Sequence, residues 1–274
     1  FEKVKDFKVR LQTEALDIDT KGRRLRVRSV VGGDEEWLAY DKLVLCTGAS
    51  PFSPPLPGLD LPGVFRLQRI EDAEGIKEMV GRKIKKATII GGGLIGVEMA
   101  ESLTERGVEV TMVEMMPTIL PGILDPEMAV MVQSHMKAKG VKIMAGARVE
   151  AIEGDSRVER VVTDQGSLDT DLVLVSIGVR PNVELAKQSG LDIGPTGAIR
   201  TDIHQQTSSE HIYAAGDCCE NRNMITGEPC FVPLGSTANK QGRVVANVIC
   251  GLTDEFPGVL GSGGCRIFDF TVAR

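Results

Sequence analysis

Three glycines, Gly91, Gly93 and Gly96, follow directly after an apolar run and precede a stretch with helical periodicity. In a strand–turn–helix unit, the first such glycine permits a tight turn and the second lets a ligand approach the backbone. The third lets the helix pack closely on the strand. The N–H groups at the start of the helix then face an anion such as a pyrophosphate. The spacing predicts a dinucleotide site, and a glycine-rich packing turn is the alternative.

An acidic residue, Glu114, ends the next apolar run, 18 residues after Gly96. A carboxylate at this point accepts hydrogen bonds from the ribose hydroxyls of an adenosine, although a solvated acid at a strand end is the alternative. No Lys or Arg occurs between Gly107 and Met136. A ribose 2′-phosphate would meet repulsion there and no local cation. We therefore expect NADH to bind in preference to NADPH.

Two further residues stand where strands are expected to end. Gly178 closes the run LVLVSIG, and Asp217 follows IYAAG. Ligands of open α/β sheets lie at the carboxyl ends of strands, so Gly178 is placed to let a cofactor ring approach and Asp217 to accept from a polyol chain. Ordinary turns are the alternative at both positions. Asn182 is expected to cap a short helix after Gly178.

The spacing of the cysteines and histidines predicts no metal or redox site. The six cysteines lack the CxxC spacing of a metal or redox pair, and vicinal disulfides are strained, so Cys218 and Cys219 are expected to be reduced thiols. The three histidines are scattered, which predicts no metal site. Cysteine usage favours a cytoplasmic location. Met112, Met115 and Met116 are expected to fill core or hinge, and the lysines at 83, 85 and 86 to form a solvated edge.

Alternating strand and helix patterns place these residues in an α/β fold. The run at 87–90, the helix after it and the run at 108–113 form a βαβ unit. A second helix is predicted from Asp125 to Gly140, with Pro126 in its first turn. Its expected apolar stripe is Met128, Met131, Val132, His135 and Met136. Strands are predicted at 141–145, 148–153, 157–163 and 171–177, and a helix at 235–251 with Val244, Val245, Val248 and Ile249 on its buried face.

The outer parts of the chain differ from this pattern. Residues 1–50 predict short strands in a β-meander, and the proline-rich stretch 51–63 predicts a stiff connector. The first residue is Phe and the last strand pattern stops at Arg274, which indicates an internal piece of a longer chain. The length of 274 residues is typical of about two domains. One of them is expected to be assembled from chain on both sides of the other.

Composition excludes some classes of function. Lys plus Arg is 32 against 38 for Asp plus Glu, giving a net charge of −6, and aromatic residues make up 4%. Sequence-independent nucleic-acid binding uses excess cations and stacking rings, so no nucleic-acid partner is expected. Uncharged apolar stretches such as Ala87 to Val97, at 11 residues, are well short of the roughly 20 residues that span a bilayer, so no membrane partner is expected either.

Five motifs, in this order, resemble those of the pyridine nucleotide-disulfide oxidoreductases: LVLCTGASPFSPPLPGLDLPGVFRL, TIIGGGLIGVEMAE, VLVSIGVRPN, TSSEHIYAAGDCCE and VPLGSTANKQGR. They are most similar to the branch that holds coenzyme A disulfide reductases, NADH oxidases and NADH-dependent polysulfide or persulfide reductases. The resemblance covers essentially the whole chain. It implies an α/β fold of two Rossmann-like three-layer FAD/NAD(P)-binding domains, with the NAD domain inserted in the FAD domain.

The resemblance also implies domain limits. The first part of the FAD domain and a linker occupy 1–80, the NAD(P) domain 81–182, and the resumed FAD domain 183–255. A C-terminal dimerisation domain begins in 256–274, which implies a homodimer for the full-length protein. The family's own FAD-pyrophosphate fingerprint and redox cysteine would precede Phe1. We therefore name no catalytic residue, and we expect this chain alone to bind NADH better than FAD and to be inactive toward a disulfide.

Residues matching the family motifs are assigned to two cofactors. The nicotinamide dinucleotide is assigned Gly91, Gly93, Leu94, Ile95, Gly96, Glu98, Glu114 and Gly178. The flavin adenine dinucleotide is assigned Thr47, Gly48, Ala49, Asp217, Leu234, Thr237 and Ala238. The implied reaction of the intact protein is hydride transfer from NADH to FAD, which is the redox-active centre together with the cysteine. The implied substrate is a small-molecule disulfide, persulfide or polysulfide, with coenzyme A as a candidate.

Three alternatives stay open at this stage. An NADH oxidase would pass the electrons to oxygen. A ferredoxin or rubredoxin reductase shares the two-cofactor layout without using a cysteine. A dinucleotide-binding sensor would have lost the flavin half altogether.

Overall fold

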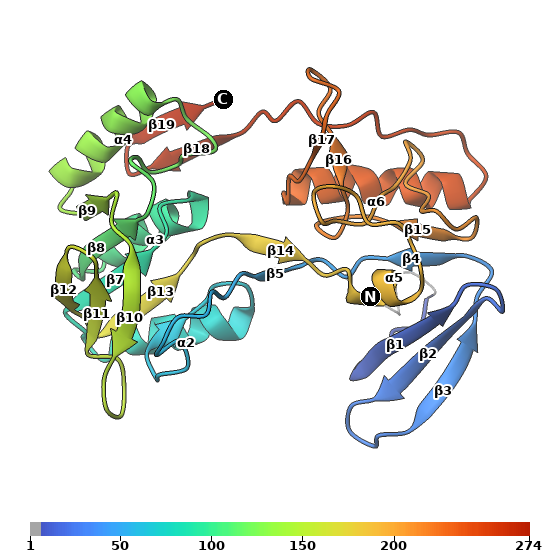
Figure 1. Ribbon diagram of the computed structural model, residues 1–274, viewed down its shortest axis with the longest axis horizontal. Helices are drawn as coiled ribbons and strands as arrows, with labels where there is room; N and C mark the ends of the chain where they lie inside the picture. The colour runs from blue at the N-terminus through green and yellow to red at the C-terminus, as the bar shows by residue number, and fades with distance from the viewer. Residues whose placement is uncertain (1–6) are drawn as a thin grey trace. The chain divides into compact units, whose positions relative to one another are not determined.

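The computed structural model describes residues 7–274, and the chain divides into two compact units that are each discontinuous in sequence (Figure 1). Unit 1 contains the chain up to Ala49 and Pro181–Gly261. Unit 2 contains Ser50–Arg180 and Ser262–Arg274. The chain therefore passes between the units three times. The α/β class is confirmed, whereas the assignment of particular domain limits stays a prediction.

Unit 2 is built on a five-stranded sheet in the order β6-β13-β7-β8-β9, and all its neighbouring strands are parallel. Its strands are apolar runs rather than alternating patterns because both faces are covered, and all four residues of β13 are buried. The bounds are β6 (Val64–Phe65), β7 (Lys86–Ile90), β8 (Glu109–Glu114), β9 (Lys142–Ala145) and β13 (Leu172–Val175).

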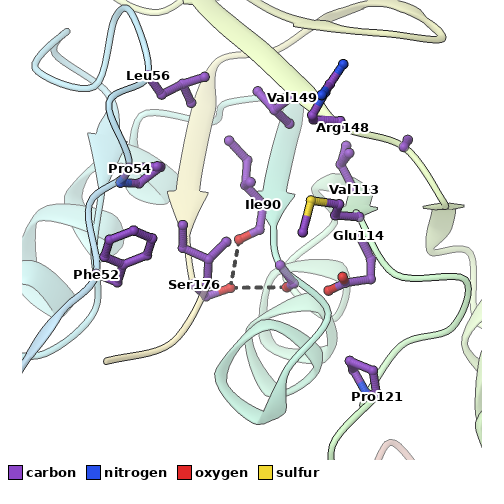
Figure 2. Close-up of a pocket in the computed structure, with 14 residues that line it drawn as sticks. Phe52, Pro54, Leu56, Ile90, Val113, Glu114, Pro121, Arg148, Val149 and Ser176 are labelled. Carbon is purple, nitrogen blue, oxygen red and sulfur yellow. Dashed lines mark hydrogen bonds between the residues drawn. The ribbon is translucent and has the colours of Figure 1, made fainter. Parts of the chain in front are cut away.

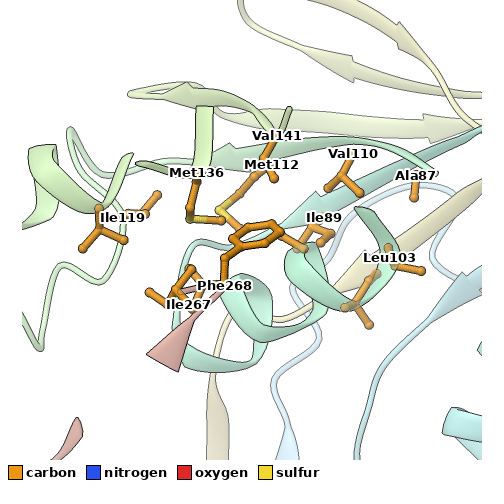
Figure 3. Close-up of a cluster of buried hydrophobic side chains, with 14 of the residues drawn as sticks. Ala87, Ile89, Leu103, Val110, Met112, Ile119, Met136, Val141, Ile267 and Phe268 are labelled. Carbon is orange, nitrogen blue, oxygen red and sulfur yellow. The ribbon is translucent and has the colours of Figure 1, made fainter. Parts of the chain in front are cut away.

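Three helices belong to this sheet: α2 (Ile70–Gly81), α3 (Leu94–Thr104) and α4 (Pro126–Ala138). The main core joins Ile89 and Met112 of the sheet with Leu103 of α3 and Met136 of α4 (Figure 3). Met112 is a core residue as expected, but Met115 and its neighbour Met116 are 66% and 44% exposed. The helix α2 was not anticipated from the sequence.

The helix α4 begins as predicted, after Asp125, but its buried face differs from the prediction. Ala129, Val132 and Met136 are buried, whereas Met128 and Met131 are 39% and 53% exposed. The predicted stripe is confirmed at Val132 and Met136 and wrong at Met128 and Met131, because it followed the larger side chains, which lie on two faces. The small Ala129 occupies the core-facing position instead.

Two smaller sheets complete unit 2. The antiparallel strands β10 (Val149–Glu153), β11 (Arg160–Thr163) and β12 (Gly166–Asp169) form one, of which β12 was not predicted. The hairpin of β18 (Gly264–Ile267) and β19 (Phe270–Ala273) forms the other. Its turn residue Phe268 lies in the main core, and the Phe268 N–H donates to Glu101 Oε2 at 2.7 Å.

Unit 1 contains the predicted antiparallel meander of β1 (Thr13–Asp19), β2 (Arg24–Ser29) and β3 (Glu35–Ala39). The expectation for the first six residues lies outside the described part of the chain. The strands β4 (Leu43–Leu45) and β15 (Ile212–Ala214) form a separate parallel pair in this unit. The unit's long helix, α6 (Gly235–Ile249), confirms the helix predicted at 235–251, with Val244 and Val245 buried.

Short elements connect these parts. They are β5 (Ala49–Pro51), β14 (Val179–Pro181), α5 (Glu184–Gln188), β16 (Asn221–Arg222) and β17 (Pro229–Cys230). Within residues 7–274, no helix has the length and apolar character needed to cross a membrane.

Candidate functional site

The turn between β7 and α3 contains two glycines that the packing requires. Gly91 has a φ of +106°, and a Cβ atom there would overlap the Ser176 carbonyl oxygen. A Cβ atom on Gly96 would overlap the Gly91 carbonyl oxygen. The first and third glycines of the motif therefore fix the close approach of helix and strand, as the spacing predicted.

Gly93, the second glycine of the motif, has different surroundings. Its φ is −78°, which other residues adopt freely, and a Cβ atom on it would meet no atom within 4 Å. Gly93 is also the N-cap of α3, where no side chain caps the helix and the first turn holds no acidic residue. The first N–H groups of α3 are thus left for an anion, and open space lies beside them.

Glu114, at the end of β8, is hydrogen-bonded to the glycine turn between β7 and α3. Its carboxylate is 9% exposed and accepts hydrogen bonds from the Gly92 N–H at 2.6 Å and the Met116 N–H at 2.7 Å. The alternative of a freely solvated acid is thereby wrong. Each carboxylate oxygen has further acceptor capacity, which a ribose hydroxyl can use.

Glu114 and Gly91 open onto a cavity of about 440 Å³, within the size range of small-molecule sites (Figure 2). The cavity lies at the carboxyl ends of β7, β8 and β13, where ligands of parallel sheets bind. Its walls are mostly apolar. The lining residues are Phe52, Pro54, Leu56, Ile90, Gly91, Val113, Glu114, Met115, Pro121, Ala147, Arg148, Val149, Ser176 and Ile177.

Sequence reasoning missed most of this lining. The Ser176 hydroxyl donates to the carbonyl oxygens of Ile90 and Gly91, both at 3.2 Å, and so ties β13 to the glycine turn (Figure 2). The feature of the sequence that could have indicated Ser176 is its place as a hydroxyl residue at the end of the apolar run LVLVSIG. No feature of the sequence indicated Arg148, because it lines the cavity from the loop between β9 and β10.

Arg148 bears on the expectation that no cation lies near the ribose site. No cation comes from 107–136, yet Arg148 lines the same cavity as Glu114. Its guanidinium lies 3.8 Å from Glu150 and is 66% exposed. In Figure 2 the Arg148 side chain extends away from Glu114, so the carboxylate is the charge next to the glycine turn.

Other predicted residues of this half lie outside the cavity lining. Leu94 and Ile95 are in the first turn of α3, and Ile95 is 39% exposed. Glu98 is an exposed residue of α3 that the structure does not bring to the cavity. Gly178 has a φ of +97° with open space around it, and its carbonyl accepts from the Phe52 N–H at 2.9 Å.

A second constellation lies in unit 1, where β4 and β15 run side by side. Thr47 and Gly48 follow β4, and Asp217 follows β15, so parallel pairing brings both segments to one sheet edge. Asn182 holds the first segment. Its side chain donates to the Thr47 carbonyl at 2.8 Å, and the Thr47 hydroxyl donates to the Asn182 carbonyl at 2.7 Å. The predicted helix cap at Asn182 is therefore wrong, and Val183 is the N-cap of α5.

The start of α6 adjoins the Gly216–Asp217 turn. A Cβ atom on Gly216 would lie 3.7 Å from the Ala238 Cβ atom. The Gly216 N–H donates to the Gln241 side-chain oxygen at 2.8 Å, and the Gln241 amide donates to Asn221 at 2.9 Å. Gln241 is 0% exposed. Sequence reasoning missed this glutamine because a polar residue on a helix is ordinarily solvated.

The N-terminus of α6 is open in the same way as that of α3. Leu234 is the N-cap, no side chain caps the helix, and its first turn holds no acidic residue. Thr237 is buried in that turn. Burial raises the pKa of the nearby Asp217 carboxyl.

The vicinal cysteines after β15 are buried and form no disulfide with each other. The Cys218 and Cys219 sulfur atoms lie 3.8 Å apart, and hydrogen bonding with Cys219 lowers the pKa of Cys218 to about 6. The same hydrogen bond and burial raise the pKa of Cys219. In the part of the chain that the structure describes, no group of three or more His, Cys, Asp or Glu residues is arranged to hold a metal.

Comparison with known proteins agrees with this geometry. Residues 2–242 match the pyridine nucleotide-disulphide oxidoreductase family, and the chain belongs to that family. Its members are FAD-dependent NAD(P)H oxidoreductases.

Individual relatives carry more specific names. An NADH oxidase of Methanocaldococcus jannaschii is 40% identical over 273 residues, covering 99% of this chain and 60% of the relative. An NAD(P)H coenzyme A polysulfide/persulfide reductase of Pyrococcus horikoshii is 39% identical over 275 residues, covering 100% of this chain and 61% of the relative. The chain thus spans about three fifths of the length of these relatives.

The structure of an NAD-dependent persulfide reductase from A. fulgidus superimposes with a TM-score of 0.97 at 43% identity. The match covers 100% of this chain and 50% of that one. The Rossmann-like arrangement of the fold is therefore shared with these oxidoreductases.

Proposed function

We propose that the protein is an FAD-dependent oxidoreductase that takes electrons from NADH and delivers them to a small disulfide, persulfide or polysulfide. The observation that carries the proposal is the cavity beside Glu114, where a glycine turn and an uncapped helix N-terminus meet. When bound, NADH supplies a hydride and FAD relays the two electrons to the acceptor.

The residues of unit 2 suit the adenosine diphosphate half of NADH. The open space at Gly93 and the free N–H groups of α3 fit a pyrophosphate. Glu114 fits the ribose hydroxyls, and the apolar wall at Val113 and Val149 fits an adenine ring. The anionic Glu114, held next to the turn, disfavours a 2′-phosphate and so favours NADH.

The residues of unit 1 suit parts of FAD. Asp217 offers acceptor oxygens for a ribityl chain, and the uncapped start of α6 offers N–H groups. Leu234, Thr237 and Ala238 lie at that helix start, while Thr47, Gly48 and Ala49 follow β4. These assignments follow the family motifs, and the shared sheet edge of β4 and β15 supports them.

The acceptor is proposed from the relatives. The coenzyme A-dependent polysulfide/persulfide reductase and the persulfide reductase favour a thiol-derived substrate, with coenzyme A as a candidate. The NADH oxidase relative favours oxygen as the second candidate. A homodimer and a reducing, cytoplasmic location are further parts of this proposal, and the free cysteines support the latter.

The test is the visible spectrum of the purified full-length protein before and after anaerobic addition of NADH. A flavin spectrum that NADH bleaches is the expected result. Turnover of NADH with coenzyme A disulfide or persulfide, measured without oxygen, then separates the two acceptors. A colourless protein that FAD does not reconstitute would overturn the proposal.

A further inference from the structure

We propose that a second cavity in unit 2 binds a phosphate monoester with an apolar or aromatic body. This cavity lies at the amino ends of β6, β7 and β13, the opposite end of these strands from the glycine turn. Its volume is about 450 Å³. The lining residues are Pro62, Gly63, Met79, Arg82, Lys83, Ile84, Lys85, Arg157 and Asp171.

Charge sets this cavity apart from the rest of the molecule. Four cations, from Arg82, Lys83, Lys85 and Arg157, face one carboxylate, Asp171, so the formal charge of the lining is +3. The whole chain carries −6. A concentration of positive charge in an acidic protein attracts anions selectively to that cavity.

The single carboxylate is already engaged by the backbone. Asp171 Oδ2 accepts hydrogen bonds from the Lys85 N–H at 2.8 Å and the Lys86 N–H at 3.0 Å. Burial works against ionisation, but these bonds hold the pKa of Asp171 below its ordinary value. Asp171 thus fixes the start of β7.

The cations remain available to a ligand. Arg82 forms an exposed ion pair with Glu78. Within residues 7–274, Lys83, Lys85 and Arg157 form no salt bridge with a protein carboxylate. The charge of Arg157 also acts on Asp171. Lys83 and Lys85 are therefore the uncommitted cations, and two positive charges match a phosphate monoester, which carries close to two negative charges at neutral pH.

The floor of the cavity is apolar. Met79 and Ile84 are partly buried, and Pro62 is an exposed apolar residue of the same lining. Gly63 brings the backbone close, since a Cβ atom there would lie 2.8 Å from Val158. An inorganic anion would leave this floor unused, whereas a ligand with a ring and a phosphate uses both parts.

Lys83 provides an independent observation. It follows the C-terminus of α2 with a φ of +59°, in the left-handed region where glycine normally ends a helix. A side chain here strains the backbone, and glycine would relieve that strain. The chain nevertheless places a cation at this position, in the lining that also contains Lys85.

The test measures binding of 1-naphthyl phosphate to the full-length holoenzyme by equilibrium dialysis, first without and then with ADP-ribose, which fills the dinucleotide cavity. We expect naphthyl phosphate to bind at least about tenfold more tightly than inorganic phosphate, and to weaken as salt is raised. The double variant Lys83→Gly with Lys85→Gln should lose at least about tenfold in affinity. Lys83→Gly relieves backbone strain, so a melting temperature that is unchanged or raised separates lost binding from lost folding.

The matched control is Lys137→Gln with Lys187→Gln, which removes two exposed lysines elsewhere and should leave binding unchanged. Three results would overturn the proposal. They are equal binding by wild type and by the Lys83/Lys85 double variant, equal affinity for inorganic phosphate, and displacement of naphthyl phosphate by ADP-ribose. None of them depends on FAD or NADH turnover, so failure here leaves the proposed oxidoreductase function unaffected.

Discussion

Gly93 and Gly96 belong to one turn but have different neighbours. A Cβ atom on Gly96 overlaps the backbone, whereas one on Gly93 meets open space. We expect Gly96→Ala to lower the free energy of unfolding by about 2 kcal/mol, as overpacking does. Gly93→Ala should change the free energy of unfolding by about 1 kcal/mol or less, but raise the Kd for NADH about tenfold or more because a methyl group enters the ligand's space.

Urea unfolding and NADH titration of the two variants check this pair of expectations. Each variant is the control for the other, since both add one methyl group within the same motif. If Gly93→Ala binds NADH as wild type does, the open space at Gly93 is not where the dinucleotide lies.

Glu114 holds the glycine turn through its hydrogen bonds and is proposed to bind the ribose of NADH. Replacing it by glutamine removes the charge and one acceptor oxygen but keeps the size of the side chain. Glu114→Gln replaces an acceptor oxygen by a donor that faces a backbone N–H of Gly92 or Met116. Because a buried N–H then loses its partner, we expect the free energy of unfolding to fall by about 1–3 kcal/mol. Affinity for NADH should fall as well, with the preference over NADPH reduced.

The control is Glu109→Gln, at the other end of β8, where the carboxylate is 65% exposed and pairs with Lys142 at 3.6 Å. It should leave NADH affinity unchanged, and its free energy of unfolding should shift by about 0.5 kcal/mol or less. Titrations of wild type and both variants with NADH and with NADPH, under the same conditions, measure the preference between the two cofactors. An unaltered preference in Glu114→Gln would contradict the assigned role.

Residues of this site differ in how far the sequence predicts them. Gly91, Gly96 and Glu114 were predictable because their spacing reflects contacts within one βαβ unit. Arg148 and Ser176 were not, because they reach the cavity from the loop after β9 and from the end of β13, which lie far from the glycine turn in the chain. Such contacts are set by strand order, which a local pattern does not encode.

At the scale of elements, Gln241 links α6 to the turn after β15. It accepts from the Gly216 N–H and donates to Asn221 while fully buried. Gln241→Leu keeps the volume but leaves both partners unsatisfied, so we expect a loss of about 1–3 kcal/mol in the free energy of unfolding. If Gln241 positions the Asp217 turn, FAD occupancy should also fall.

Asn221→Asp tests positioning separately, since its carboxylate still accepts the hydrogen bond from Gln241 and should keep FAD occupancy. Lys240→Leu, at the exposed neighbouring position of α6, controls for a new apolar residue on the helix. Flavin content, flavin absorbance maxima and reduction potential are the measurements. Full occupancy with an unshifted potential in Gln241→Leu would limit this glutamine to a structural role.

Helix positions were predicted better than helix faces. The starts of α4 and α6 follow from Asp125–Pro126 and from the apolar spacing of 244–249. The predicted buried face of α4 was right at Val132 and Met136 but wrong at Met128, because hydrophobicity favoured Met128 over Ala129 while close packing favours the smaller side chain. The cap of α5 was wrong because Asn182 bonds to Thr47, a partner 135 residues away.

The hairpin β18–β19 is expected to loosen from α4 in acid. Asp269 in its turn lies 2.9 Å from both Lys139 Nζ and His135 Nε2, and hydrogen bonding with Lys139 lowers the pKa of Asp269. A depressed pKa in the folded state means that the contribution to stability is full above the unfolded value, near pH 4, and is lost as pH falls through the folded value. Amide protection factors of residues 264–273 between pH 3 and 6, which correct for the intrinsic pH dependence of exchange, measure it. Asp269→Asn should remove the pH dependence of this protection.

At the scale of the whole molecule, each unit has its own hydrophobic core. Unit 2 contains the core around Ile89 and Met112, and unit 1 contains the core around Ile199 and Ile212. A chain of about two parts was predictable from its length and its ordered motifs, whereas both units are discontinuous in sequence. The inclusion of Ser262–Arg274 in unit 2 was not, because it depends on Phe268 packing among residues that precede it by more than 100 positions.

Separate cores imply that ligands of one unit act mainly on that unit. ADP-ribose, which lacks the nicotinamide ring, should fill the Glu114 cavity alone and slow hydrogen exchange in the glycine turn, the first turns of α3 and the end of β8. The segments after β4 and β15 should exchange at their original rates. Glu114→Gln should abolish most of the protection in unit 2, whereas Glu109→Gln should retain it. Equal protection of both units by ADP-ribose would show that the units respond as one body, and would contradict the assignment of this cavity as a self-contained dinucleotide site.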